Sequence, residues 1–282
     1  SFKDFELIII DNNNKKNIKK IIYSFSKLDN RVKILTKKKG NLSEILNFGI
    51  KYSKGRFIAR QDTDDFSHKE RFKKQIKWFQ KDSSRVLCGT NCILLDSNGN
   101  KIKNKKLPTK NLEIKKLLRL QNPFIHSSIM VKKNIFKKLN YYNIYFNSAQ
   151  DYDAWTKIST MGIIGNLNQN LLKYTIHKNS ISFKNKYKQN VYALLASSNL
   201  AYYDFYRKFK YFKTSPEKEI LKFTSDKNIK FKIKFLIYIY MSNLKRKFKL
   251  ELKDFNIKTL SFAFKFPTFF IKSIIKNNLW GT

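Results

Sequence analysis

The sequence predicts an α/β fold in which a mixed, mostly parallel sheet is flanked by helices. The apolar run "FELIIID" at 5–11 has the character of a buried parallel strand, because such strands are covered on both faces. Stretches with helical spacing of apolar residues follow at 17–28 and 42–53, and strand-like runs separate them. Regular alternation of strand and helix is typical of sheets with helices packed on their faces.

The first half of the chain alternates strictly. The expected elements are a strand at 5–11, a helix at 17–28, a strand at 32–35, a helix at 42–53, a strand at 56–60 and a helix at about 68–81. Asn41 with Glu44, and Ser67 with Glu70, have the spacing of capping boxes, which predicts where the second and third helices begin.

In the second half the expected strands are longer, and strand and helix no longer alternate strictly. The expected elements are a strand at 86–96, a hairpin-type turn at 97–100, a helix at 111–120, a strand at 127–132 with a short helix after it, a helix at 151–162 and a strand at 171–177. Gly162 is expected to end the last helix. From about residue 183 the chain becomes rich in Lys and aromatic residues with helical spacing. The sequence therefore predicts a domain at 1–182 and a helical, basic extension at 183–282.

The composition indicates a folded but very basic chain. The 282 residues carry 59 Lys+Arg against 20 Asp+Glu, a formal net charge of +39. Two interpretations stay open: attraction to polyanions, or a compositional bias expressed on solvated faces. Cys88 and Cys92 are expected to be small buried side chains. The longest apolar run, at 235–241, is far shorter than the ~18 residues of a membrane span.

One short stretch concentrates negative charge. "RQDTDDFS" at 60–67 places Asp62, Asp64 and Asp65 directly after an expected strand, at the edge where open α/β sheets bind ligands. Neighbouring carboxylates repel unless a cation lies between them, and Mg²⁺ or Mn²⁺ suits such ligands. The alternative is that Asp65 and Ser67 cap the next helix, which explains Asp62 poorly because it lies too far before that helix.

Several segments, taken in order, resemble a known family. They are "DFELIIID" (4–11), "LNFGIKYSKGRFIARQDTDD" (46–65), "ERFKKQ" (70–75), "NPFIHSSIMVKK" (122–133), "QDYDAW" (150–155) and "YTIHKNSIS" (174–182). Together they look like the nucleotide-binding half of family-two glycosyltransferases, which have the Rossmann-like GT-A fold. The resemblance covers roughly residues 2–182.

The resemblance implies a site for a metal-bound nucleotide-sugar. By match, Asp62 and Asp64 would hold a Mn²⁺ or Mg²⁺ ion that bridges the donor diphosphate, with Asp65 as a weaker candidate. His177 matches a histidine that completes the metal or diphosphate site. Asp11 matches an acid that contacts the nucleoside. Asn12 stands where the family has a second acid, and it is either a nucleoside ligand or a plain turn residue.

The resemblance also implies an acceptor side. Asp151 matches the general base that deprotonates the acceptor hydroxyl, so the reaction would invert the anomeric configuration. Gln150 replaces the usual Glu, which should lower the pKa of Asp151 relative to a paired acid. His126 matches a position that lines the acceptor and donor-sugar cleft, although a structural role is the alternative. Trp155 is expected in the core.

One departure from the family concerns its opening strand and helix. The chain begins at the segment that normally follows them, so we expect this unit to be missing and nucleotide binding to be impaired. The expected function is transfer of a sugar from a nucleotide donor, UDP-sugar being favoured, to a saccharide or lipid-linked saccharide in cell-surface polysaccharide synthesis. The alternative is an inactive remnant or an accessory binding module of the same fold.

The Lys- and aromatic-rich stretches within 183–282 favour contact with an anionic membrane surface. The expected location is therefore cytoplasmic, peripheral on the inner face of the membrane. A plain helical cap on the catalytic domain is the alternative. Nucleic acid is not an expected partner, because Arg is scarce in this region.

Overall fold

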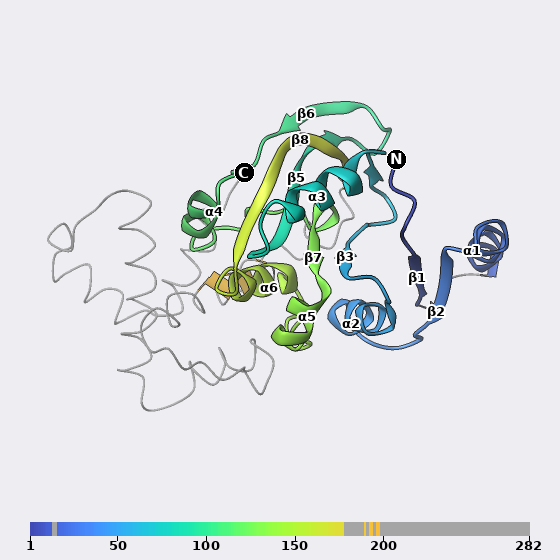
Figure 1. Ribbon diagram of the computed structural model, residues 1–282. Helices are drawn as coiled ribbons and strands as arrows, with labels where there is room; N and C mark the ends of the chain where they lie inside the picture. The colour runs from blue at the N-terminus through green and yellow to red at the C-terminus, as the bar shows by residue number, and fades with distance from the viewer. Residues whose placement is uncertain (13–15, 178–188, 190–191, 194–195, 198–282) are drawn as a thin grey trace, which may run out of the picture.

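The computed structural model describes residues 1–12, 16–177, 189, 192–193 and 196–197 (Figure 1). Its first unit is a two-stranded parallel sheet. β1 (Leu7–Asp11) and β2 (Val32–Thr36) pair in register, with Leu7 opposite Val32. α1 (Lys16–Leu28) is the crossover between them. This unit lies at one side of the domain and pairs with no strand of the larger sheet among the described residues.

The second sheet has six strands in the order β3-β7-β5-β8-β4, with β6 added along β5. Its strands are β3 (Phe57–Ala59), β4 (Phe66–Ser67), β5 (Arg85–Leu95), β6 (Lys101–Lys105), β7 (Met130–Lys132) and β8 (Ile163–Thr175). β5 and β8 run parallel, whereas β7 is antiparallel to both β3 and β5. The prediction of a mixed sheet is confirmed. The prediction that it is mostly parallel is wrong, because the other described pairings of this sheet, β3 with β7, β7 with β5, β5 with β6 and β4 with β8, are antiparallel.

Helices surround the sheets. They are α2 (Leu42–Tyr52), α3 (Arg71–Gln80), α4 (Asn111–Leu117), α5 (Lys133–Leu139) and α6 (Gln150–Ile158), with a 3-10 turn η1 (His126–Ser128) before β7. The capping box at the start of α2 is confirmed: the Asn41 side chain accepts from the Glu44 N–H at 3.0 Å, and the Glu44 carboxylate accepts from the Asn41 N–H at 2.7 Å.

The predicted capping box at Ser67 and Glu70 is wrong. α3 begins only at Arg71, and the residue before it makes no side-chain cap. Ser67 belongs instead to β4, where it pairs with Leu172 of β8, and its hydroxyl donates to Gln61 at 2.6 Å. The local signal was overridden by strand pairing across more than a hundred residues. Asp65 and Ser67 therefore do not start a helix.

Two other boundaries differ from the prediction. α6 ends at Ile158, four residues before Gly162, and beyond it the Thr160 and Met161 N–H groups donate to carbonyls only three residues back, which does not continue the α-helix. Gly162 serves a close approach instead, since a Cβ there would lie 2.4 Å from the Ser84 carbonyl oxygen. β8 starts at Ile163 rather than at 171. Its Asn-rich first half hid this strand, because Asn is depleted in strands.

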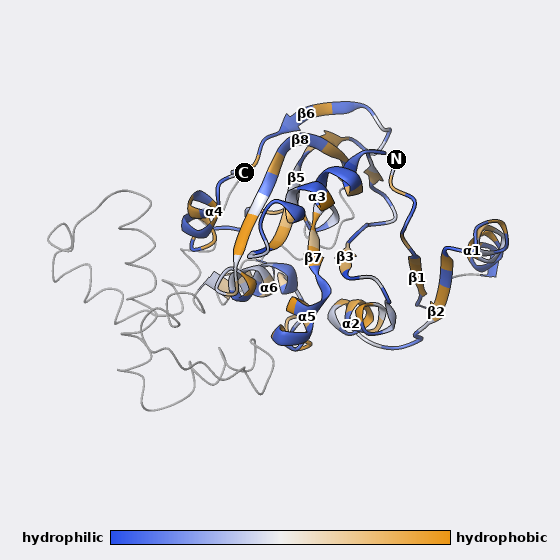
Figure 2. Ribbon diagram, viewed as in Figure 1, coloured by the Kyte–Doolittle hydropathy of each residue, from blue (hydrophilic) through white to orange (hydrophobic). Residues whose placement is uncertain are grey.

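The main core lies between the six-stranded sheet and helices α4, α5 and α6, where apolar strand residues meet apolar helix faces (Figure 2). Trp155 is fully buried, as predicted, and contacts the rings of Phe124 and Tyr142. Cys88 and Cys92 are buried and unpaired, also as predicted. The extension at 183–282 lies almost wholly outside the described residues, although Tyr192 and Ala196 are buried in this core.

A cavity of about 1220 Å³ separates the two sheets. Its walls include apolar residues of β1 and β3, and it reaches Asp62 in the loop after β3. The Glu6 carboxylate spans one end, where it accepts from the Gly55 N–H at 3.0 Å. Within the described part of the chain, no helix is both long and apolar enough to cross a membrane.

Candidate active site

The loop between β3 and β4 gathers three carboxylates. Asp62, Asp64 and Asp65 each have an oxygen atom within 4.8 Å of the others. Asp65 is 8% exposed, and burial raises the pKa of its carboxyl. Its Oδ2 atom is buried without a hydrogen-bond partner. A buried carboxylate oxygen without a donor, beside two further carboxylates, fits the requirements of a divalent cation.

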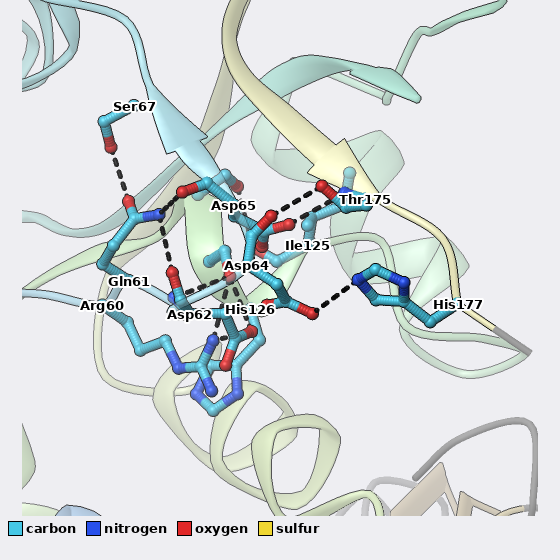
Figure 3. Close-up of polar contacts among 12 residues, drawn as sticks. Arg60, Gln61, Asp62, Asp64, Asp65, Ser67, Ile125, His126, Thr175 and His177 are labelled. Atoms are coloured by element: carbon cyan, nitrogen blue, oxygen red, sulfur yellow. Dashed lines mark hydrogen bonds and ion pairs between the residues drawn. The ribbon is translucent and has the colours of Figure 1, made fainter. Parts of the chain in front are cut away.

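The end of β8 also holds this loop in place. The Thr175 N–H donates to Asp65 Oδ1 at 2.9 Å, and the Thr175 hydroxyl donates to the Asp64 carbonyl at 2.6 Å (Figure 3). Two residues further on, His177 Nε2 lies 3.4 Å from Asp64 Oδ2. The structure thus brings His177 to the acidic loop across more than a hundred residues of sequence.

η1 contacts the third side of the loop through Ser127. The Ser127 hydroxyl donates to Asp62 Oδ2 at 2.7 Å and lies 3.2 Å from the Asp62 N–H. Arg60 donates to the same hydroxyl at 2.9 Å and forms an ion pair with Asp62. The charge of Arg60 also interacts with the carboxylates of Asp64, Asp65 and Asp151.

Asp151 lies in the first turn of α6 and is half-buried. Asn122 Nδ2 donates to its Oδ2 atom at 2.7 Å, and the Phe124 N–H fixes that amide by donating to Asn122 Oδ1 at 3.1 Å. Burial raises the pKa of Asp151, while the Tyr152 N–H, Asn122 and Arg60 lower it. Gln150, beside it, is 7% exposed.

His126 lies at the start of η1 among aromatic rings. Its Nε2 atom is 2.9 Å from the Tyr142 hydroxyl, and its ring is 5.9 Å from that of Trp155. Burial lowers the pKa of His126 well below its usual value, which keeps the ring neutral. These contacts favour the structural interpretation of His126, although the ring is only half-buried.

Asp11 and Asn12 lie at the carboxyl end of β1, on the smaller sheet. Asp11 is 2% exposed and lies 3.4 Å from Lys19 Nζ. The Asn12 amide, oriented with its nitrogen toward the carbonyl oxygens of Lys37 and Lys38, donates to both. This contact ties the loop after β1 to the loop after β2.

Sequence reasoning missed several residues of the site. Ser127, Thr175 and Asn122 donate hydrogen bonds to the carboxylates of Asp62, Asp65 and Asp151. Gln61 and Arg71 instead donate to main-chain carbonyls of the loop and of Arg60 before it. Ser127 and Asn122 stand in the segment "NPFIHSS" that drew attention to His126. Their roles depend on long-range contacts, which spacing along the chain does not reveal.

Solved structures with the same fold define the class. Residues 1–349 of S. aureus TarS superpose with a TM-score of 0.52 at 16% identity, over 72% of this chain and 64% of that one. A mannosyltransferase from Pyrobaculum calidifontis, solved with GDP-Man and Mn²⁺, gives a TM-score of 0.50 at 13% identity, over 86% of this chain and 62% of that one. The protein therefore has the GT-A fold.

Sequence comparisons give the family. The family model described as Glycosyl transferase family 2 matches residues 1–139. The O-antigen biosynthesis glycosyltransferase WbnJ of Escherichia coli is 39% identical over 184 residues, which cover 64% of this chain and 71% of WbnJ. The chain belongs to glycosyltransferase family 2.

The expectation that the family's opening strand and helix are missing is not supported. The family match starts at residue 1, and the first strand of the structure begins soon after it, at Leu7. The prediction that nucleotide binding is impaired depended on that missing unit and is therefore not supported either.

Proposed function

We propose that the protein is an inverting, metal-dependent glycosyltransferase that moves a sugar from a nucleotide-diphosphate donor to a saccharide or lipid-linked saccharide. The single observation that carries this proposal is the convergence of Asp62, Asp64 and Asp65 around the orphaned Oδ2 atom of Asp65. Three carboxylates in such proximity repel one another, and no hydrogen-bond donor reaches the Oδ2 atom of Asp65. Because the chain belongs to family 2, the expected ligand of this cluster is a divalent cation that binds the diphosphate of a nucleotide-sugar.

The donor site is built from the acidic loop. Asp62, Asp64 and Asp65 would hold Mn²⁺ or Mg²⁺, which, when bound, stabilises the charge that develops on the departing nucleoside diphosphate. His177, 3.4 Å from Asp64, is placed to orient that carboxylate or to contact the diphosphate. Asp11 and Asn12, at the carboxyl end of β1, are proposed to contact the nucleoside.

The acceptor side is built around Asp151. Its raised pKa makes the carboxylate a stronger base than an exposed Asp, which suits removal of a proton from the acceptor hydroxyl. Asn122 donates to Oδ2 and so orients the carboxylate. Gln150 is proposed to line the cleft for the sugar and the acceptor, whereas the contacts of His126 with Tyr142 and Trp155 favour a structural role. Attack from the side of Asp151, opposite the leaving diphosphate, inverts the anomeric carbon.

The similarity to WbnJ supports a role in cell-surface polysaccharide synthesis, with a UDP-sugar as the first donor to test. Purified protein is incubated with a panel of UDP- and GDP-sugars, Mn²⁺ and saccharide acceptors, and release of nucleoside diphosphate is followed. We expect Mn²⁺-dependent release that EDTA abolishes and a product of inverted configuration by NMR. A retained configuration, or turnover unaffected by EDTA, would contradict the proposal. Donor binding without any turnover would favour an accessory binding module.

A membrane-surface location is proposed from α1. Ile21, Phe25 and Leu28 lie on one flank of this helix and are 56%, 59% and 83% exposed. The helix carries four lysines and no acid in the sequence "KNIKKIIYSFSKL". Exposed apolar residues beside basic ones are typical of helices that lie in an anionic membrane interface. The proposed location is the inner face of the cytoplasmic membrane.

Vesicle flotation tests this location. The protein should float with vesicles that contain phosphatidylglycerol and much less with phosphatidylcholine alone. The double change Phe25→Ser with Leu28→Ser should weaken flotation severalfold. Ile102→Ser, at an exposed position of β6, is the matched control. Equal flotation of the parent and the double variant would reject α1 as the contact.

A further inference from the structure

Arg71, the first residue of α3, is a fully buried cation with an unusual set of partners. Its NH1 group donates to the Ser127 carbonyl at 2.6 Å, to the Ser67 hydroxyl at 2.7 Å and to Gln61 Oε1 at 3.0 Å. Its NH2 group donates to the Arg60 carbonyl at 2.8 Å. Buried charges usually pair with an opposite charge. These four bonds instead go to neutral oxygens around the acidic loop.

Gln61 extends this network into the loop itself. Its Oε1 atom accepts from Arg71 and from the Ser67 hydroxyl. Its Nε2 atom donates to the carbonyls of Asp62 at 3.0 Å and Asp65 at 2.8 Å. The side chain thus lies inside the turn and bridges its first and last acids (Figure 3). Gln61 is exposed, so burial alone does not account for its position.

The network opposes the repulsion among the acids. Carboxylates within 4.8 Å of one another tend to separate, and the loop would open unless its backbone were held. Arg71 fixes the carbonyls at the two segments that meet there, Arg60 after β3 and Ser127 in η1. Gln61 fixes the turn between Asp62 and Asp65. Neither residue bonds a carboxylate oxygen of the cluster, because their bonds to the loop and to its neighbours go to carbonyl, hydroxyl and amide oxygens.

We propose that Gln61 and Arg71 are positioning residues that preorganise the Asp62–Asp65 turn for a divalent cation before the cation arrives. The inference rests on the proposed metal site. It predicts that both residues set cation affinity without touching the cation. Preorganised ligands bind more tightly because less conformational freedom is lost on binding.

The test measures Mn²⁺ binding by electron paramagnetic resonance, together with thermal unfolding, for the full chain and four variants. Gln61→Leu removes both halves of the bridge at an exposed position, and Gln61→Glu keeps the acceptor toward Arg71 but loses the donor toward the carbonyls. Arg71→Lys keeps the charge with fewer donors. Gln169→Leu, at an exposed position of β8, is the matched control.

We expect the Kd for Mn²⁺ to rise about tenfold in both Gln61 variants and in Arg71→Lys. The unfolding temperature should change little in the Gln61 variants, and Gln169→Leu should match the parent. A parent chain that binds no Mn²⁺ would refute the proposed metal site. A parent that binds Mn²⁺, with Gln61 variants that bind it equally well, would refute the positioning role alone. An Arg71→Lys chain that stays folded and binds Mn²⁺ as tightly as the parent would refute the positioning role of Arg71.

Discussion

His177 Nε2 lies 3.4 Å from Asp64 Oδ2, although 112 residues separate the two along the chain. The contact arises because β4 pairs with β8, which carries the segment after Thr175 past the acidic loop. The same pairing brings the Thr175 N–H within hydrogen-bond distance of the buried carboxyl of Asp65. The short strand β4 therefore joins the two halves of the proposed donor site.

The Asp64–His177 pair gives the first prediction. Asp64→Asn should lower the transfer rate at least about a hundredfold, because one cation ligand is lost. His177→Ala should lower it about tenfold, since His177 acts beside that ligand. Rates at saturating Mn²⁺ and donor, measured by nucleoside diphosphate release, check both. Glu113→Gln, at an exposed acid on α4, should match the parent. A His177→Ala variant with unchanged dependence on Mn²⁺ would exclude it from the donor site.

Replacing Asp65 should stabilise the folded chain while it weakens the proposed cation site. Burial raises the pKa of Asp65 in the folded chain, so its ionisation above about pH 4 disfavours folding. Asp65→Asn keeps the acceptor for the Thr175 N–H and removes the buried charge. Its unfolding temperature at pH 7 should exceed that of the parent by about 2–4 °C, or about 1 kcal/mol.

The pH dependence identifies the cause of that difference. The stabilisation by Asp65→Asn should shrink as the pH falls through the raised pKa of Asp65 in the folded parent, and it should be lost below about pH 4, where the carboxyl is protonated in both states. Adding Mn²⁺ should raise the unfolding temperature of the parent and leave that of the variant nearly unchanged. Differential scanning fluorimetry measures both effects. A variant less stable than the parent at neutral pH would show that Asp65 is an ordinary structural acid.

Asn122 controls the proposed base. Its hydrogen bond favours the ionised form of Asp151 and so lowers a pKa that burial has raised. The base acts when ionised, so the rate should rise with pH through this pKa. Asn122→Ala should move the inflection to higher pH, and Asn122→Asp should move it further because two acids would then face each other. Asp151→Asn should lower the rate about 10²–10⁴-fold at every pH. Inflections that stay in place in both Asn122 variants would contradict this role.

Trp155, in the main core, gives a prediction about stability. Its ring is fully buried and contacts the rings of Phe124, His126 and Tyr142. Trp155→Ala should lower the free energy of unfolding by about 3–5 kcal/mol through the cavity it leaves. Chemical denaturation measures this loss. A loss below about 1 kcal/mol would show that the helix α6 is not held by this cluster.

The sequence was informative where local patterns and the final structure agree. The apolar run of β1, the helical spacing of α1 and the capping box of Asn41 and Glu44 each act within a few residues, so their elements could be predicted. Local patterns failed at Ser67, where a capping signal gave way to pairing with Leu172. They failed again in the Asn-rich start of β8, which is a strand because β5 pairs with it.

The residues of the candidate site also divide into those that the sequence could predict and those that it could not. The acids stand out in a basic chain, so Asp62 and Asp64 could be found from spacing and from resemblance to the family. The interpretation of Asp65 as a helix cap was wrong, because its carboxyl accepts from Thr175 of β8. The residues that hold the acids, among them Ser127, Gln61 and Arg71, are ordinary polar positions in the sequence. Only the folded chain brings them to the loop.

The most direct test of the central claim is calorimetric titration of UDP and GDP into the full chain with and without Mn²⁺. If Asp62, Asp64 and Asp65 form a cation site for a nucleotide diphosphate, at least one nucleotide should bind with Mn²⁺ present, and binding should fall at least about tenfold with EDTA. The double change Asp62→Asn with Asp64→Asn should remove the Mn²⁺-dependent part, while Glu113→Gln should retain it. Nucleotide binding of equal strength with Mn²⁺, with EDTA and in the double variant would contradict the account.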